Sequence, residues 1–120
     1  MNYSKLYSPY KESQGGIEMT SKRLYMIFSE SEMKRIAISA EQNSQLSIKV
    51  DVHGLKCYEA KRFLNNLINI VQDVFILIVI HGYNHGTAIK EMLAKNFNNK
   101  HVQHQYTDPH NLGVTNMLIV

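Results

Sequence analysis

The feature that most constrains the fold is the changing spacing of apolar residues between Leu46 and Ile80. From Leu46 to His53 apolar and polar residues alternate, which predicts a strand with one buried and one open face. From Cys57 the apolar residues recur at helical spacing, which predicts a helix of about four turns. The run from Val74 to Ile80 is apolar throughout, as expected of a central strand. These residues therefore predict a strand–helix–strand unit.

Three more elements are predicted downstream. A helix is expected from Thr87 to about Phe97, followed by strands over Val102–Tyr106 and Val114–Val120. Because a helical crossover joins parallel neighbours, the first two strands should be parallel, with their C-terminal ends at one edge. We predict an α/β fold, a two-layer βαβαββ sandwich with a four-stranded mixed sheet and both helices on one face.

The chain before residue 46 lacks such clear patterns. Residues 1–21 show no sustained period and are expected to form a disordered tail. Residues 22–45 are expected to form an N-terminal extension that packs on the domain formed by residues 46–120. We expect a single functional unit, because 120 residues are enough for about one domain.

Two local patterns occur within the extension. Residues 24–28 are largely apolar and predict a strand, which is expected to cover the sheet face that the helices leave bare. Ser29-Glu30-Ser31-Glu32 is a capping box, and the apolar residues after it predict a short amphipathic helix over residues 33–40. The alternative is a hairpin that pairs residues 24–28 with residues 35–39.

Composition narrows the class of protein. Hydrophobic residues make up 44% of the chain and charged residues 19%, which is typical of a globular protein. The longest apolar run has seven residues, whereas a membrane-spanning helix needs about 20, so no membrane partner is expected. With Cys57 as the single cysteine no internal disulfide can form, and a cytoplasmic location is expected. The net charge of +3 is compatible with a polyanionic partner.

Asp51 and His53 form the first candidate for chemistry. They lie two residues apart on the open face of a predicted strand, so the carboxylate can orient an imidazole whose ordinary pKa lies near neutral pH. Such a pair can serve as a general acid or base. The alternative is that both side chains only solvate the open face of the sheet.

The loop His81-Gly82-Tyr83-Asn84-His85-Gly86 is the second candidate. Its two glycines allow successive backbone N–H groups to face one anion at the N-terminus of the next helix, where a phosphate would fit. The alternative is an ordinary strand-to-helix turn. His53 and His81 each end a parallel strand and are expected to meet, where they could exchange protons with a phosphodiester while Lys56 or Lys90 neutralises charge.

These motifs resemble those of the Smr (small MutS-related) domain family. Val50-Asp51-Val52-His53-Gly54-Leu55 is similar to its Leu-Asp-Leu-His-Gly motif, and His81-Gly82 with the following helix is similar to its His-Gly-x-Gly loop. Gly113-Val114-Thr115 resembles its last-strand motif. Asn84 stands where the family has its second loop glycine. The resemblance covers about residues 46–120.

The resemblance implies a fold similar to the C-terminal domain of bacterial translation initiation factor three. It also implies nucleic-acid binding, with the nicking or RNA-cleaving endonuclease activity of some members. Asp51 and His53 match the family's first functional pair, and His81 and Gly82 match the second.

Together these observations predict a cytoplasmic nucleic-acid-binding protein that cleaves DNA or RNA, with Asp51, His53 and His81 as catalytic residues. The residues expected to bind phosphate or nucleic acid are Gly54, Lys56, Gly82, Tyr83, Asn84, His85, Gly86, Thr87 and Lys90. No protein-bound metal site is expected, although Mg²⁺ or Mn²⁺ could assist cleavage. The alternative is a non-catalytic adaptor for nucleic acid or the ribosome. A monomer or weak homodimer is expected.

Overall fold

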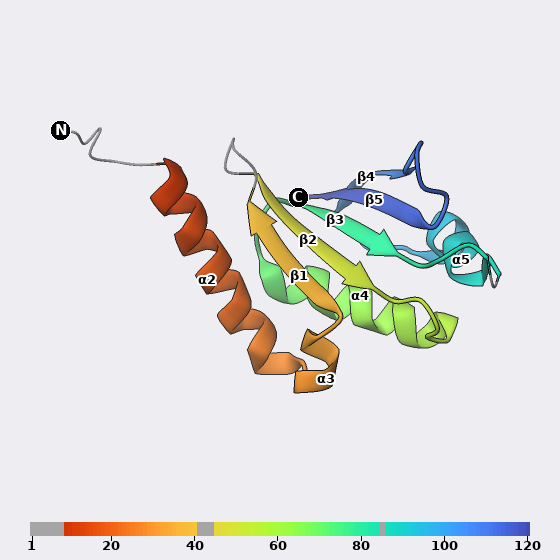
Figure 1. Cartoon of the computed structure of the whole chain (residues 1–120), viewed down its shortest axis with the longest axis horizontal. Helices are drawn as coiled ribbons and strands as arrows, with labels where there is room; N and C mark the ends of the chain where they lie inside the picture. Colours follow the sequence, from red (N-terminus) through yellow and green to blue (C-terminus); the bar gives the residue numbers. More distant parts are fainter. Residues whose placement is uncertain (1–8, 41–44, 85) are drawn as a thin grey trace.

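The structure, a computed structural model, describes residues 9–40, 45–84 and 86–120, with side chains from residue 16 onward. Its centre is a five-stranded sheet of order β1-β2-β3-β5-β4 (Figure 1). The strands are β1 (Ile36–Ala40), β2 (Leu46–Asp51), β3 (Phe75–Ile80), β4 (Val102–Thr107) and β5 (Val114–Ile119). The helices are α2 (Pro9–Ile27), α3 (Glu30–Met33), α4 (Cys57–Val71) and α5 (Ala88–Asn96).

The sheet is mixed, as predicted. Strands β2 and β3 are parallel, and the β1–β2, β3–β5 and β4–β5 pairs are antiparallel. The α/β class and the parallel strand–helix–strand unit are therefore confirmed. The predicted count of four strands is wrong, because β1 adds a fifth strand at the edge of β2.

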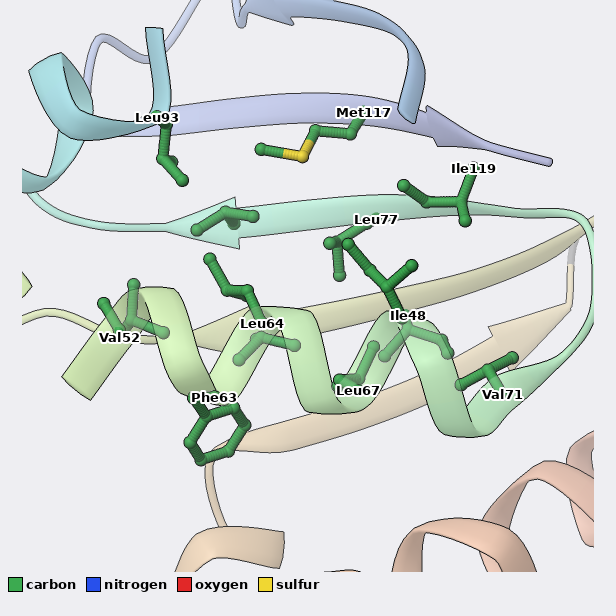
Figure 2. Close-up of a cluster of buried hydrophobic side chains, with 14 of the residues drawn as sticks. Ile48, Val52, Phe63, Leu64, Leu67, Val71, Leu77, Leu93, Met117 and Ile119 are labelled. Carbon is green, nitrogen blue, oxygen red and sulfur yellow. The ribbon is translucent and has the colours of Figure 1, made fainter. Parts of the chain in front are cut away.

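The core lies between the sheet and α4 (Figure 2). The apolar stripe of α4 that the helical spacing predicts is buried against the inward-facing side chains of β2, β3 and β5, as expected for an amphipathic helix on a sheet. Fully buried members of this core include Ile48, Val50, Leu64, Leu67, Val71, Phe75, Leu77 and Met117. The fully buried residues therefore come from both layers, the sheet and α4.

The two faces of β3 are covered unequally. Phe75, Leu77 and Val79 are buried on the helix side, whereas Ile76, Ile78 and Ile80 are half-buried on the other side. The continuous apolar run predicted a strand covered on both faces, and the second face is only partly shielded. In the described part of the chain, no helix is both long and apolar enough to cross a membrane.

The N-terminal residues differ from the prediction. Residues 9–27 form helix α2, so the disordered tail over 1–21 is wrong for residues 9–21, while residues 1–8 lie outside the described part. The predicted strand at 24–28 is also wrong. Leu24 and Phe28 lie one helical turn apart and are both buried. An apolar run of this length fits either a buried helical turn or a strand, so the sequence alone does not separate the two.

This helix packs on α4 and on the edge strand β1 rather than over the half-buried face of β3. The Phe28 ring stacks on Phe63 of α4 with centroids 4.7 Å apart, and Arg23 Nη1 donates to the Val71 carbonyl at 2.7 Å. Met26, which was expected to cover the sheet, is 76% exposed. The expectation of a cover for the bare face is therefore wrong, although the extension does contribute to the core.

Residues 29–40 form one helical turn and a strand. The capping box is confirmed, since the Ser29 hydroxyl accepts from the Glu32 N–H at 3.2 Å and the Glu32 carboxylate accepts from the Ser29 N–H at 2.8 Å. The helix ends at Met33. Residues 36–40, which alternate in burial, form strand β1 and pair with β2. Both the longer helix and the alternative hairpin are wrong, because the free edge of β2 supplies the backbone partners.

Candidate functional site

A cavity of about 380 Å³ lies where β2 and β3 end, at the edge to which both arrowheads point in Figure 1. His53 and His81 both line it, so the parallel topology brings the two strand-end histidines to one site as predicted. The other lining residues are Gly54, Leu55, Gly82, Tyr83, Asn84, Gly86, Ala88 and Ile89. The described part of the lining contains no carboxylate.

Asp51 and His53 form a hydrogen-bonded pair at the end of β2. The His53 Nδ1 lies 2.5 Å from Asp51 Oδ1, and the His53 backbone N–H donates to the same oxygen at 3.1 Å. Because an ionised carboxylate only accepts, this contact places a proton on Nδ1. No described residue bonds to Nε2, and the His53 side chain is 67% exposed. The pair therefore presents Nε2 to solvent or to a ligand.

The surroundings of Asp51 keep it ionised. Partial burial by itself raises the pKa of this carboxyl, but the hydrogen bonds from His53 and the nearby charges of His53 and Arg35 outweigh burial and lower the pKa overall. The ionised carboxylate can hold the His53 ring and stabilise an imidazolium when one forms. This is the arrangement that a general base requires.

Arg35 belongs to this site and was not predicted from the sequence. Its Nη1 donates to the carbonyl of Asp51 at 2.9 Å and lies 3.5 Å from the carbonyl of His53. The residue was missed because residues 33–40 were predicted to be helical. The period-2 pattern of residues 36–40, read as a strand beside β2, was the signal that could have placed Arg35 near Asp51.

His81 lies in a very different environment from His53. Its side chain is buried, Nδ1 donates to the Gly82 carbonyl at 2.8 Å, and Nε2 lies 2.9 Å from the Thr115 hydroxyl. Since a carbonyl can only accept, the neutral ring carries its proton on Nδ1 and accepts from Thr115. Burial lowers the pKa of His81; the bond to Gly82 opposes this shift, and the charge of Lys90 adds to it.

These bonds give His81 a structural connection to β5. They also occupy both ring nitrogens, so proton transfer to a substrate would require one of the bonds to open. The backbone reinforces the connection, because the N–H groups of His81 and Gly82 both donate to the Gly113 carbonyl, at 2.9 and 3.1 Å. The N–H of Gly82 is therefore already used and does not face an anion.

Three glycines shape the loops around the cavity. Gly54 and Gly82 have φ of +82° and Gly86 has φ of +118°, which are conformations that side chains disfavour. A Cβ atom on Gly113 would lie 3.2 Å from the backbone of Gly82, so this residue allows β5 to approach the loop closely. A side chain at position 113 would therefore push the start of β5 away from the loop that lines the cavity.

Of the other residues predicted to bind phosphate or nucleic acid, some line the cavity and others do not. Tyr83 and Asn84 are exposed on the cavity wall, and Lys90 Nζ lies 5.6 Å from the centre of the Tyr83 ring. The Thr87 hydroxyl donates to the Glu91 carboxylate at 2.7 Å. Lys56 is exposed, and like Thr87 and Lys90 it is not among the residues that line the cavity. His85 lies outside the described residues.

A bound cation finds little support in these side chains. Within the described residues no group of three or more His, Cys, Asp or Glu side chains could hold a metal ion. Mg²⁺ is usually held by one or two carboxylates together with substrate phosphates, and Asp51 Oδ1 already accepts two bonds from His53. We therefore assign no step to Mg²⁺ or Mn²⁺.

Comparison with known proteins adds no assignment. No family model matches the chain, and no curated protein or solved structure is significantly similar to it. What the site does is therefore inferred from its own residues.

Proposed function

We propose that this chain is a cytoplasmic nucleic-acid-binding protein of the Smr type that cleaves phosphodiester bonds of DNA or RNA at the cavity where β2 and β3 end. The observation that carries the proposal is the Asp51–His53 pair, with an exposed Nε2 on the wall of a glycine-shaped cavity. A base oriented by a carboxylate and open to a ligand is what activation of an attacking oxygen needs.

In this mechanism His53 Nε2 takes the proton from the attacking oxygen, which is a water molecule or a ribose 2′-hydroxyl. The new oxygen–phosphorus bond forms as the bond to the leaving oxygen breaks, and the leaving oxygen takes a proton from solvent. Asp51 holds the ring and stabilises the imidazolium. Lys90, close to the Tyr83 ring, offsets negative charge on the phosphate.

We assign His81 a positioning role in this proposal. Its bonds to Gly82 and Thr115 hold the glycine loop against β5, and its lowered pKa keeps the ring neutral. The sequence predicted a second proton-transfer group at this position. Since both nitrogens are bonded, His53 is the better candidate for proton transfer.

Cleavage of branched DNA, single-stranded RNA and ribosomal RNA by the purified protein, with and without EDTA, tests the proposal. The His53→Ala protein should lose at least about a hundredfold in rate, because a positioned general base contributes that much or more. His104→Ala is the matched control, since this exposed histidine lies on β4 and does not line the cavity. Equal cleavage by the wild type and His53→Ala would overturn the assignment.

A non-catalytic adaptor for nucleic acid or the ribosome is the second candidate. It is favoured by the engagement of both His81 nitrogens and of the Gly82 N–H, which leaves His53 as the one described histidine of the cavity with an unbonded ring nitrogen. RNA retardation in gels without turnover under any metal condition would select the adaptor.

A further inference from the structure

We propose that Arg35, which comes from the N-terminal extension, is a positioning residue for His53, so that the segment α3–β1 completes the candidate site. The inference rests on the proposed function and deepens it, because it names a residue on which the orientation of the proposed base, His53, depends. Arg35 precedes residue 46 and lies outside the part of the chain that resembles the Smr domain.

Arg35 makes two hydrogen bonds with the backbone of Asp51. The Asp51 N–H donates to the Arg35 carbonyl at 2.9 Å, and Arg35 Nη1 donates back to the Asp51 carbonyl at 2.9 Å. The same Nη1 lies 3.5 Å from the His53 carbonyl, at the limit of a hydrogen bond. One side chain thus contacts the backbone carbonyls of both members of the pair, and hydrogen bonds donated by a cation are stronger than those between neutral groups.

The position of Arg35 is itself fixed by local structure. Its N–H donates to the Glu32 carbonyl at 3.0 Å, which joins it to the capped turn α3. From the next residue onward β1 pairs with β2, beginning at Ile36 opposite Val50. The side chain is half-buried and lines a small cavity of about 120 Å³ together with Phe28, Glu59 and Arg62. Arg35 is therefore a half-buried contact and not a free surface cation.

The turn after β2 has few other restraints. The Leu55 N–H donates to the Val52 carbonyl at 3.1 Å, Gly54 adopts a positive φ, and the His53 side chain is exposed. The His53–Asp51 contact needs the turn in one conformation, since both the ring and the backbone N–H reach the same oxygen. We infer that the guanidinium selects this conformation, which places the ring with Nε2 outward.

The test measures the His53 ring directly by ¹⁵N NMR at about pH 9, where an imidazole is neutral. In the wild type the ring should be protonated on Nδ1, as the contact with Asp51 requires. In Arg35→Met the ratio of the Nδ1–H to the Nε2–H form should fall about tenfold, the effect of losing a hydrogen bond to a charged group. Arg35→Lys, which keeps the charge but not the planar fork, should lie between the two.

Arg62→Met is the matched control, because it removes a cation that lines the same small cavity without bonding to the turn. It should leave the His53 tautomer unchanged. Urea unfolding of each variant shows whether it is folded, and Arg35→Lys is the second variant should Arg35→Met fail to fold. An unchanged tautomer in folded Arg35→Met, or an equal change in Arg62→Met, would overturn the inference.

The NMR readout needs no nucleic acid, so the inference and the proposed function can fail separately. If the tautomer changes in Arg35→Met but the protein cleaves no nucleic acid, Arg35 is a positioning residue and the proposed nuclease function is wrong. If cleavage depends on His53 but Arg35→Met changes neither its rate nor its pH profile, the nuclease function stands and the proposed role of Arg35 is wrong.

Discussion

The two histidines of the cavity differ in what their ring nitrogens contact. His53 bonds through Nδ1 to Asp51 and its side chain is largely exposed, whereas His81 is buried with both nitrogens bonded. An exposed ring can exchange protons with a substrate, and a buried, fully bonded ring adds order to the loop. The same residue type at two strand ends therefore occupies two different environments.

The lowered pKa of His81 predicts that the protein loses stability in mild acid. The unfolded chain takes up a proton near the ordinary value of 6.5, while the folded protein does so only at lower pH. The stabilisation is therefore fully present above pH 6.5 and is lost as pH falls through the folded pKa. Urea unfolding from about pH 8 to pH 5 should show the free energy of unfolding decreasing.

His81→Gln should flatten this decrease, because the titrating group is gone. His104→Gln, a change at an exposed position on β4, should leave it as in the wild type. Asp51 also has a lowered pKa, but its contribution is lost only below its ordinary value of 3.8, outside this range. A slope that is the same with and without His81 would contradict the prediction.

Residue-level prediction worked where the partners are close in sequence. Asp51 and His53 are two residues apart, so a short pattern was enough to predict that they act together. The bond between His81 and Thr115 spans 34 residues. Whether a histidine at a strand end is free or bonded depends on such distant partners, and spacing does not reveal them.

At the level of elements, α2 is attached to the domain along one face, where Ile17 packs against the core and Thr20 and Leu24 are buried. Leu24 and Phe28 enter the core, and Arg23 donates to the carbonyl of Val71 at the end of α4. The outward side of the same helix carries Tyr25 and Met26, which are 66% and 76% exposed. The docking of this helix therefore depends on a narrow apolar stripe.

Phe28→Ala should lower the free energy of unfolding by about 3 kcal/mol, because it removes a buried ring that stacks on Phe63 and leaves a cavity. Urea unfolding at neutral pH measures the change. Tyr25→Ala on the exposed side of the same helix should cost less than about 0.5 kcal/mol. Similar losses for the two variants would show that α2 does not dock on α4 as described.

The elements after residue 46 were predicted within a few residues of their observed bounds, and those before it were not. In the later part each element has a distinct apolar period of adequate length. Residues 24–28 are too few to separate a strand from a helix, and the capping box of residues 29–32 marks where a helix starts but not how long it runs. Residues 36–40 form a strand because they pair with the edge of β2.

The whole molecule carries a net charge of +3, which favours a polyanion without marking a strongly basic surface. Binding to nucleic acid should therefore weaken as salt rises, because phosphate contacts release counterions. Among the described residues near the cavity, Lys90 is the cation whose charge reaches His81 and which lies beside Tyr83.

Fluorescence anisotropy with labelled RNA over a salt series checks this prediction. Lys90→Gln should weaken binding and make the slope of log K against log salt less negative by about 1, as expected for one lost phosphate contact. Lys100→Gln should change neither quantity, because this lysine precedes β4 at the opposite end of the sheet. Salt-independent binding, or equal effects of both variants, would contradict a phosphate contact at Lys90.

The sequence by itself determined the α/β class, the parallel β2–α4–β3 unit and the meeting of two histidines at one edge, because periodicity sets burial and a helical crossover sets strand direction. Only the tertiary structure decided that β1 closes the edge of β2, that Arg35 joins the site and that His81 is bonded on both sides. Each of these depends on partners distant along the chain, and hydrogen bonds between such partners follow from the packing of whole elements.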